Sequence, residues 1–349
     1  MIIGNGEFYQ KIPHCFSKVI KNVMLKIGNL ELEGFPLVLS PMDDVTDRPF
    51  RGVCKRFGAD LLITEFIASE ALVREVEKSR RKMQFDEAER PIGIQIFGHD
   101  ADALIRSLEF VEQAKPDFVD INWGCPMRKI AGRGAGSGAL RDPDRLVETT
   151  AAIVKASHLP VTVKTRLGYD ENSKPIVELA ERLQDVGVAA ISIHGRTKTQ
   201  LYRGTADWTL IGKVKENPRM QIPVFGNGDI TTPEMADEYR RRYGVDGILI
   251  GRAAIGNPWI FEQTHHVMDG QPQRTITVAE RVEVCRSHLL AAVQWKDERT
   301  AILEMRKHYS GYFKGLFDFK PFRLKLVSLT NLDELLAVFD DIAEHYQNI

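Results

Sequence analysis

The chain has 349 residues, of which 43% are hydrophobic and 27% are charged, and its formal net charge is -1 at pH 7. This composition is ordinary for a soluble globular protein, and the length favours one large domain with an appendage. The four cysteines form no CxxC pair and no Cys/His cluster, which argues against a zinc or iron–sulfur site and favours a reducing compartment. Since the sequence shows no signal-peptide core and no membrane-spanning run, we expect a cytoplasmic enzyme or binding protein with no membrane or metal partner.

Residues 1–35 are predicted to form an N-terminal extension, in which "VMLKIGNLELEGF" indicates a hairpin that caps a barrel floor. Eight short apolar runs follow, each succeeded by a helical pattern. The runs are "PLVLS" (36–40), "DLLITEF" (60–66), "PIGIQIF" (91–97), "DFVDINW" (117–123), "PVTVKTR" (160–166), "AAISIHG" (189–195), "IPVFGN" (222–227) and "VDGILIG" (245–251).

This strand–helix rhythm predicts an α/β fold, a (β/α)8 TIM barrel over residues 36–266. Asp142 before Pro143 and Thr232 before Pro233 mark two of the helix starts. The alternative is a doubly wound open sheet, but no GxGxxG follows the first run. Residues 267–276 are predicted to form a linker.

Residues 277–349 are predicted to form a C-terminal helical domain. It opens with "TVAE" (277–280), a capping box in which Thr277 caps the helix and Glu280 reciprocates.

Near the ends of four neighbouring predicted strands, polar side chains occupy the alternate positions that share one face of the strand. They are Gln95, Asn122, Lys164 and His194, each alternating with apolar residues of its strand. A single buried His or Lys is more often a structural residue, but four in one phase at matching strand ends indicate a site. In TIM barrels the C-terminal ends of the strands carry the chemistry.

The last two strands lead into glycine-containing turns, "FGNGDI" (225–230) and "GRAAIGNPWIF" (251–261). The loops after strands 7 and 8 of such barrels frequently bind phosphate through backbone N–H groups. Gly228 and Gly251 permit close approach of the backbone, and Arg252 can pair with the phosphate. Together with Lys164 and His194 they outline a pocket for a phosphorylated cofactor with a polar ring, and FMN fits that outline.

Cys125 lies in "DINWGCPMRKIAGRGAGSG" (120–138), a glycine-rich loop that follows a strand. Free cysteines are mostly buried and inert, so the residue is either a small apolar side chain in a turn or a reactive group above a site.

The motifs "LSPMDDVTD", "TEF", "QIFG", "DINWGCP", "VTVKTRLGYD", "HGRTKTQLYRGTADW", "VFGNGDI" and "IGRAAIGNPWIF" occur in the order expected of tRNA-dihydrouridine synthases. The chain resembles the bacterial B-type subgroup over roughly residues 36 to 345. In that family an FMN-containing barrel reduces uridine in tRNA, and NADPH restores the reduced flavin. The resemblance therefore implies an oxidoreductase that acts on a CH–CH bond.

The resemblance also implies roles for individual residues. Those expected to bind FMN are Pro41, Met42, Asp43, Gln95, Lys164, His194, Asn227, Gly228, Asp229, Gly251 and Arg252. Asn122 and Arg166 are expected at the substrate, and Cys125 matches the family's proton donor. The chain departs from the family pattern at Asp43-Asp44, where many members have a small residue or a glutamate with glycine, and at Trp123, where the residue is often smaller.

The expected reaction needs an acid. Hydride adds to C6 of uracil from one face, and C5 must be protonated from the other. A thiol with a pKa of ~8.5 is mostly protonated at neutral pH. Cys125 is therefore expected to act as an acid and not as an activated thiolate.

Residues 299–325 hold seven Lys or Arg and two acidic residues, a local net charge of +5. Ile302, Met305, Tyr309 and Phe313 are predicted to pack on one face of a helix there. A solvated basic face is the simplest interpretation, but the interleaved aromatics favour RNA. The residues expected to contact tRNA are Arg306, Lys307, Lys314, Lys320 and Arg323, with Arg128, Lys129 and Arg133 beside the cysteine loop.

Three other functions stay open from the sequence. One is an FMN barrel that reduces a free pyrimidine, similar to dihydroorotate dehydrogenases; another is a Schiff-base aldolase that uses Lys164; the third is a non-catalytic tRNA-binding or folding protein. A monomer is expected. The sequence does not specify which tRNAs or which uridine position the protein modifies, and NADPH is preferred over NADH only by resemblance.

Overall fold

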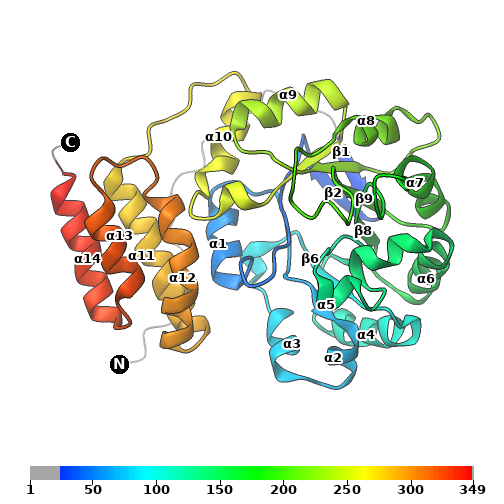
Figure 1. Ribbon diagram of the computed structural model, residues 1–349, viewed down its shortest axis with the longest axis horizontal. Helices are drawn as coiled ribbons and strands as arrows, with labels where there is room; N and C mark the ends of the chain where they lie inside the picture. Colours follow the sequence, from blue (N-terminus) through cyan, green and yellow to red (C-terminus); the bar gives the residue numbers. More distant parts are fainter. Residues whose placement is uncertain (1–23, 348–349) are drawn as a thin grey trace.

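The computed structural model describes residues 24–347, and a closed parallel barrel with helices around it forms most of this range (Figure 1). The barrel strands are β3 (Leu37–Leu39), β4 (Leu61–Ile63), β6 (Ile92–Phe97), β7 (Phe118–Asn122), β8 (Val161–Arg166), β9 (Ala190–His194), β10 (Val224–Asn227) and β11 (Gly247–Ile250). The ring closes because β11 pairs with β3, and β4 pairs with β6. The short β5 (Ile67–Ala68) lies beside β6. The predicted TIM barrel is confirmed, and the open sheet is excluded.

Helices follow the strands and cover the outside of the barrel (Figure 1). They are α1 (Arg48–Arg56), α2 (Ser69–Val73), α3 (Glu77–Lys82), α4 (Ala101–Gln113), α5 (Arg128–Ala131), α6 (Pro143–Ala156), α7 (Ile176–Asp185), α8 (Thr209–Glu216), α9 (Pro233–Tyr243) and α10 (Trp259–Met268), with 3-10 turns at Glu87–Glu89, Gly136–Arg141 and Arg252–Ala254. Asp142 and Thr232 cap α6 and α9 as predicted, because their side chains accept from the N–H groups of Arg145 and Met235.

The two faces of the strands have different partners. Ile94, Ile121, Val163 and Ile193 are buried in the main core, which includes apolar residues of the surrounding helices. The side chains at the alternate positions of these strands face the barrel interior. Its lower part is apolar and contains residues such as Phe118, while the upper part of the same strand carries polar Asp120 and Asn122. Alternation along a strand therefore separates the packing face from the face that can build a site.

A hairpin lies against the lower end of the barrel. Its strands β1 (Met24–Ile27) and β2 (Leu30–Glu33) are antiparallel. Leu25, Ile27 and Leu32 pack in one cluster with the lower interior residues of the barrel, including Phe118 and Phe225. The hairpin thus covers the end of the barrel opposite to the site. Residues 1–23 of the predicted extension, with Cys15, lie outside the described residues.

Four helices follow the barrel: α11 (Val278–Trp295), α12 (Glu298–Tyr312), α13 (Lys320–Ser328) and α14 (Leu332–His345). They enclose a second core to which α1 contributes Val53 and Phe57 and α10 contributes Trp259. Ile302, Met305, Tyr309 and Phe313 are all buried in it, as their spacing predicted. Within residues 24–347, no helix combines the length and apolarity that a membrane crossing requires. The domain boundaries at residues 35, 266 and 277 stay predictions.

The predicted capping box of α11 is only half formed. Thr277 caps the helix by accepting from the N–H of Glu280. The Glu280 carboxylate, however, accepts from Arg274 at 2.7 Å and from the Trp259 indole at 3.1 Å. The reciprocal bond was therefore a wrong prediction, because a guanidinium from the linker binds that carboxylate instead.

Arg51 holds together the loop that follows β3. Its guanidinium is buried and donates to the Glu89 carboxylate at 2.6 Å, to the Thr46 carbonyl at 3.1 Å and to the Gln84 carbonyl at 2.9 Å. Burial raises the pKa of Glu89, although the Arg51 guanidinium acts in the opposite direction. Residues 41–46 are thereby attached to the underlying α1 and to the turn before β6.

We predict that Arg51→Met lowers the free energy of unfolding by about 3–5 kcal/mol, because it leaves the buried Glu89 carboxylate without its cation. Chemical denaturation measures this loss. Arg182→Met, which breaks a pair with an exposed Asp144, is the control and should cost less than about 1 kcal/mol. Equal losses in the two variants would contradict the prediction.

Candidate active site

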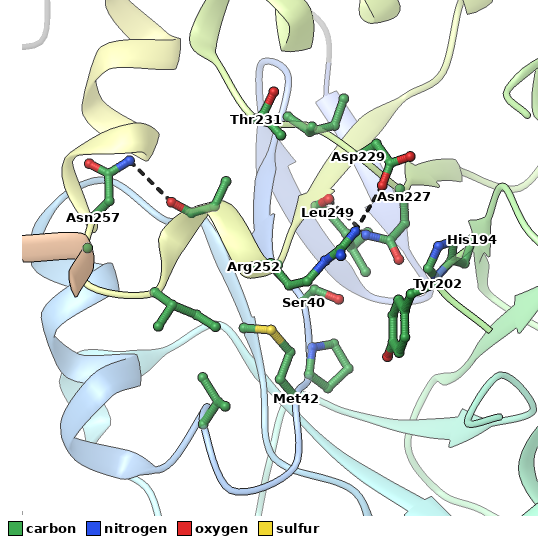
Figure 2. Close-up of a pocket in the computed structure, with 18 of the residues that line it drawn as sticks. Ser40, Met42, His194, Tyr202, Asn227, Asp229, Thr231, Leu249, Arg252 and Asn257 are labelled. Atoms are coloured by element: carbon green, nitrogen blue, oxygen red, sulfur yellow. Dashed lines mark hydrogen bonds and ion pairs between the residues drawn. The ribbon is translucent and has the colours of Figure 1, made fainter. Parts of the chain in front are cut away.

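A cavity of about 1290 Å³ opens at the C-terminal end of the barrel and extends to α10 and α12. It is lined by the loops that follow β3, β4, β7, β9, β10 and β11 and by the end of β8 itself, and Figure 2 shows part of this wall. Most side chains predicted from the sequence line it: Pro41, Met42, Asp43, Asn122, Cys125, Lys164, Arg166, His194, Asn227, Gly228, Asp229, Gly251, Arg252, Lys307 and Lys314.

Cys125 lies at the wall of this cavity, just after β7. The residue is 7% exposed, and burial raises the pKa of its thiol. The Asn122 side-chain oxygen accepts from the Cys125 N–H at 2.8 Å and from the Gly124 N–H at 2.9 Å. The Cys125 carbonyl accepts from the backbone and the hydroxyl of Ser137. The thiol is thus held at a defined place and stays protonated at neutral pH.

A buried polar network lies directly below Cys125. The Gln95 amide donates to Asp120 at 2.6 Å and accepts from Asn122 at 2.8 Å, and Thr162 donates to the other oxygen of Asp120 at 2.5 Å. Burial raises the pKa of Asp120 to about 6. Gln95 is fully buried and does not line the cavity, so it supports Asn122 from beneath.

Lys164, at the end of β8, brings a buried positive charge to the cavity. Its ammonium donates to the Asn227 side-chain oxygen at 3.2 Å, and Asn227 donates in turn to the Leu249 carbonyl. Burial, followed by the nearby Arg166, lowers the pKa of Lys164 to about 8. The ammonium is mostly charged at neutral pH, but it titrates within an accessible range.

Arg196 organises the other side of the cavity, where β9 and β10 end. Its guanidinium makes two bonds to Asp229, at 2.6 and 3.0 Å, and lies 3.2 Å from the His194 Nε2. Burial, with help from four nearby arginine and lysine charges, lowers the pKa of His194 well below its usual value. The imidazole is therefore neutral at pH 7 and available for hydrogen bonding.

Asp229 also holds Arg252, which donates to its Oδ1 at 2.9 Å (Figure 2). The Arg252 side chain remains 59% exposed and faces the cavity. Burial would raise the pKa of Asp229, but bonds from Arg196 and Ala206 outweigh it and lower that pKa. Sequence reasoning missed Arg196 as a site residue, although it follows His194 in the quoted "HGR" motif.

Gly228 and Gly251 line the cavity with backbone that carries no side chain. Gly228 has φ +125°, and a Cβ there would meet Ala206 at 2.7 Å and the His194 ring at 3.2 Å. At Gly251 a Cβ would reach Ser40 and Met42 at 3.5 Å. A side chain at Gly228 would therefore strain the backbone and push against Ala206 and His194, whereas a Cβ at Gly251 would make only ordinary contacts.

Arg166 and Tyr202 form a second feature of the wall. The Arg166 guanidinium donates to the carbonyls of Gly124, Thr197 and Leu201, and so ties the cysteine loop to the loop after β9. The Tyr202 ring is 57% exposed, with Arg252 at 5.2 Å and Arg166 at 5.6 Å from its centre. Sequence reasoning did not single out Tyr202, because a tyrosine in a loop carries no periodic signal.

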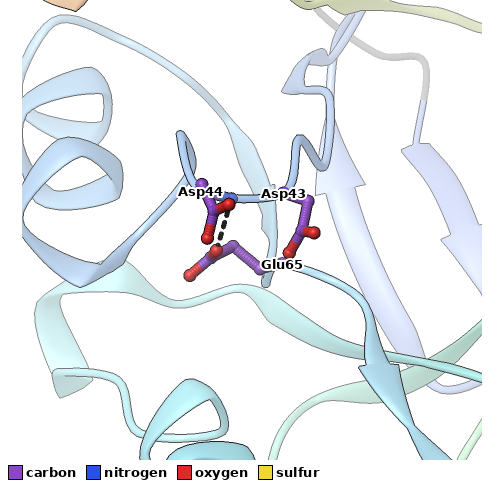
Figure 3. Close-up of side chains that lie close together, drawn as sticks. All are labelled: Asp43, Asp44 and Glu65. Atoms are coloured by element: carbon purple, nitrogen blue, oxygen red, sulfur yellow. Dashed lines mark hydrogen bonds between the residues drawn. The ribbon is translucent and has the colours of Figure 1, made fainter. Parts of the chain in front are cut away.

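Asp43, Asp44 and Glu65 lie together beside the cavity (Figure 3). Lys82 lies between two of them, with its ammonium 2.6 Å from Asp43 and 3.2 Å from Glu65. The Glu65 carboxylate also accepts from the N–H of Asp44 at 2.7 Å, and Asp44 has φ +57°. The Asp43 and Glu65 carboxylates are therefore matched by an ammonium and a backbone donor of the chain itself.

Other predicted residues lie away from the cavity wall. Arg306 donates to the Leu329 carbonyl at the end of α13, and Lys320 and Arg323 are exposed on α13. Lys307 does line the cavity, but its ammonium donates to the Asp44 carbonyl. Trp123 is buried in the main core with its indole bonded to Thr150, so this departure from the family pattern points away from the site.

We predict that Asn122→Ala lowers the free energy of unfolding by about 1–3 kcal/mol for each buried polar group that it leaves unpaired. The loosened loop should also expose the Cys125 thiol and accelerate its alkylation, measured by peptide mass spectrometry. The control is Ser137→Ala, which keeps the backbone bond to the Cys125 carbonyl and should change both quantities less. Wild-type stability and alkylation rate in Asn122→Ala would contradict the role given to this amide.

Comparisons with known proteins agree with this geometry. A family model described as dihydrouridine synthase matches residues 38–347. A probable tRNA-dihydrouridine synthase of Rickettsia conorii is 37% identical over 93% of this chain and 97% of that protein. The tRNA-dihydrouridine synthase B of Vibrio vulnificus is 34% identical over 91% of this chain and all of that protein.

Solved structures resemble the fold at lower identity. Histamine dehydrogenase from Rhizobium sp. 4-9 gives a TM-score of 0.54 at 12% identity, over 78% of this chain and 51% of that one. Morphinone reductase in complex with tetrahydroNAD gives 0.51 at 14% identity, over 70% of this chain and 90% of that one. The chain therefore belongs to the dihydrouridine synthase family of oxidoreductases.

Proposed function

We propose that this dihydrouridine synthase reduces the C5=C6 bond of uridine in tRNA, with FMN as its cofactor and NADPH as its reductant. The single observation that carries the proposal is a protonated thiol, Cys125, on the wall of the same cavity as Lys164 and His194. The tRNA-dihydrouridine synthases of Rickettsia and Vibrio, which align with almost the whole chain, support tRNA as the substrate.

The residues that line the cavity suit FMN. Arg252 and the turns at Gly228 and Gly251 combine a cation with accessible backbone, which suits a phosphate. Neutral His194 accepts from Arg196 at Nε2, which leaves its Nδ1–H as the ring's donor, and Asn227 is fixed by its bonds to Lys164 and Leu249. When bound, FMN supplies the hydride that adds to C6 of uracil.

Cys125 supplies the proton to C5 in this proposal. Burial keeps the thiol in its acid form at neutral pH, and the Asn122 amide holds its backbone in place. Lys164 would stabilise the negative charge that builds up on a reduced cofactor bound in this cavity. Arg166 binds the cysteine loop to the loop that carries Tyr202, and so keeps the two walls of the uracil site together.

The size of the site favours RNA over a free pyrimidine. The cavity continues beyond the barrel mouth to Arg281 and Lys314 of the C-terminal helices, where a free base would leave most of the volume empty. The exposed Arg128, Lys129 and Arg133 follow the cysteine and can meet phosphates beside the target. A uridine in folded tRNA must leave its stack to reach Cys125, as in other enzymes that modify bases.

We predict that Cys125→Ala lowers dihydrouridine formation by about 10²–10⁴-fold, because C5 loses its acid. The assay incubates FMN-loaded enzyme and NADPH with unmodified tRNA and measures the two-dalton mass gain by nuclease digestion and mass spectrometry. FMN absorbance and tRNA affinity should equal those of the wild type. A wild-type enzyme that forms no dihydrouridine would refute the proposed function, whereas a fully active Cys125→Ala would refute only the role of the thiol.

We predict that FMN affinity falls as the pH rises through about 8, because Lys164 loses its charge there. Lys164→Met should bind FMN about 10-fold more weakly at pH 7, consistent with the ~1.5–3 kcal/mol of a hydrogen bond to a charged group, and lack this pH dependence. Fluorescence titration with FMN between pH 7 and 9.5 gives both results. Lys213→Met, on the outer face of α8, is the control and should keep the wild-type profile; a Lys164→Met profile identical to it would exclude Lys164 from the cofactor site.

A further inference from the structure

The turn that joins α12 to α13 reaches the rim of the cavity. Lys314 and Gly315 line the cavity, and the turn continues through residues 316–319 to the start of α13. Two of its aromatic rings, those of Phe313 and Phe319, are buried with their centres 4.8 Å apart. The ring between them in sequence, Phe317, is 86% exposed, which is the largest value among the exposed large apolar side chains in residues 24–347.

The turn that carries the exposed Phe317 ring is held in place by hydrogen bonds on two sides. Arg281 of α11 donates to the Lys314 carbonyl at 2.9 Å, and the Tyr346 hydroxyl donates to the Phe317 carbonyl at 2.5 Å. Gly315 and Asp318 both have left-handed backbones, with φ +83° and +52°, which turn the chain so that neighbouring rings point inward. Phe317 is therefore presented to solvent by a defined backbone, at a cost in apolar hydration.

Cationic residues precede and follow Phe317 in the sequence. Lys314, Lys320 and Arg323 flank it along the chain, and none of them has an ion pair within the described range 24–347, whereas Lys325 pairs with Asp341. Asp318 is the acidic residue of the turn. An aromatic ring among unpaired cations is the arrangement with which proteins hold single-stranded nucleic acid, because bases stack on the ring while the cations meet phosphates.

We propose that Phe317 is a stacking platform for an unpaired base of the tRNA other than the uridine that is reduced. The inference rests on the proposed function, because it deepens the description of how that substrate is bound. Phe317 lies two residues beyond Gly315, outside the cavity that the reacting uridine must enter. The ring therefore meets a base that is near the target in the folded tRNA, and it contributes to binding and not to chemistry.

The test is equilibrium binding of unmodified tRNA to the FMN-loaded enzyme without NADPH, so that no turnover occurs. Phe317→Ala is expected to weaken binding about 5- to 150-fold, which corresponds to the ~1–3 kcal/mol of one base stacked on an aromatic ring. Phe317→Trp should restore wild-type affinity, and Phe317→Leu, which keeps apolar surface without an aromatic face, should not. With tRNA at saturation, the rate of dihydrouridine formation by Phe317→Ala should equal that of the wild type.

Met24→Ala is the control, because Met24 is 46% exposed on the hairpin at the opposite end of the barrel and should leave tRNA affinity unchanged. Wild-type affinity in Phe317→Ala would overturn the proposal. Equal affinity of the Leu and Phe forms would overturn it as well, since the surface would then be apolar without stacking, as in a protein contact. Wild-type enzyme that binds tRNA but forms no dihydrouridine would refute the proposed function. The effect of the Phe317 substitutions on tRNA affinity would still test the stacking proposal.

Discussion

The Asn122 amide joins the loop that carries Cys125 to the barrel. Its oxygen accepts from two successive N–H groups, those of Gly124 and Cys125, and its nitrogen donates to Gln95. Because Gln95 is bound in turn to Asp120, the position of the thiol follows from the rigid interior of the barrel. Breaking the hydrogen bonds of a buried, fully paired amide costs free energy. The loop is therefore held in place as firmly as β6 and β7, to which these amides belong.

Positive charge dominates the cavity that this loop overlies. Lys164, Arg166, Arg196 and Arg252 approach one another from the ends of β8, β9 and β11, with Asp229 as their main counter-ion. Burial is the main cause of the lowered pKa values of Lys164 and Arg166, to about 8 and about 10, and the neighbouring cations Arg166 and Arg196, respectively, lower them further. An anionic ligand would relieve the repulsion among these cations, so the proposed phosphate site does not require a net positive charge on the whole chain.

The C-terminal helices complete the wall that the barrel leaves open. Lys296, between α11 and α12, binds Asp47 at 2.6 Å and also pairs with Glu304. Lys307 of α12 donates to the Asp44 carbonyl, on the loop that follows β3. This helix therefore fixes one edge of the cavity, and Lys314 in the turn that follows it extends the cationic lining toward solvent.

The sequence by itself determined the barrel, the phase of its strands and the place of Cys125. Period-two alternation decides which side chains face the interior, and glycine and proline mark where strands turn into helices. These are local properties, so Lys164, His194 and Asn122 were recognisable before any contact was known. The same reasoning identified Ile302, Met305 and Tyr309 as the packing face of α12.

Only the tertiary structure decided which of the polar side chains were left to meet a ligand. Gln95 points to the same face of its strand as the other polar residues, but its side-chain amide is hydrogen-bonded to Asp120 and Asn122. Lys307 is tied to Asp44, some 260 residues away in the chain, and Arg196 became an organising residue because β10 brings Asp229 to it. Pairing between distant segments depends on how the whole chain folds, and no local period encodes it.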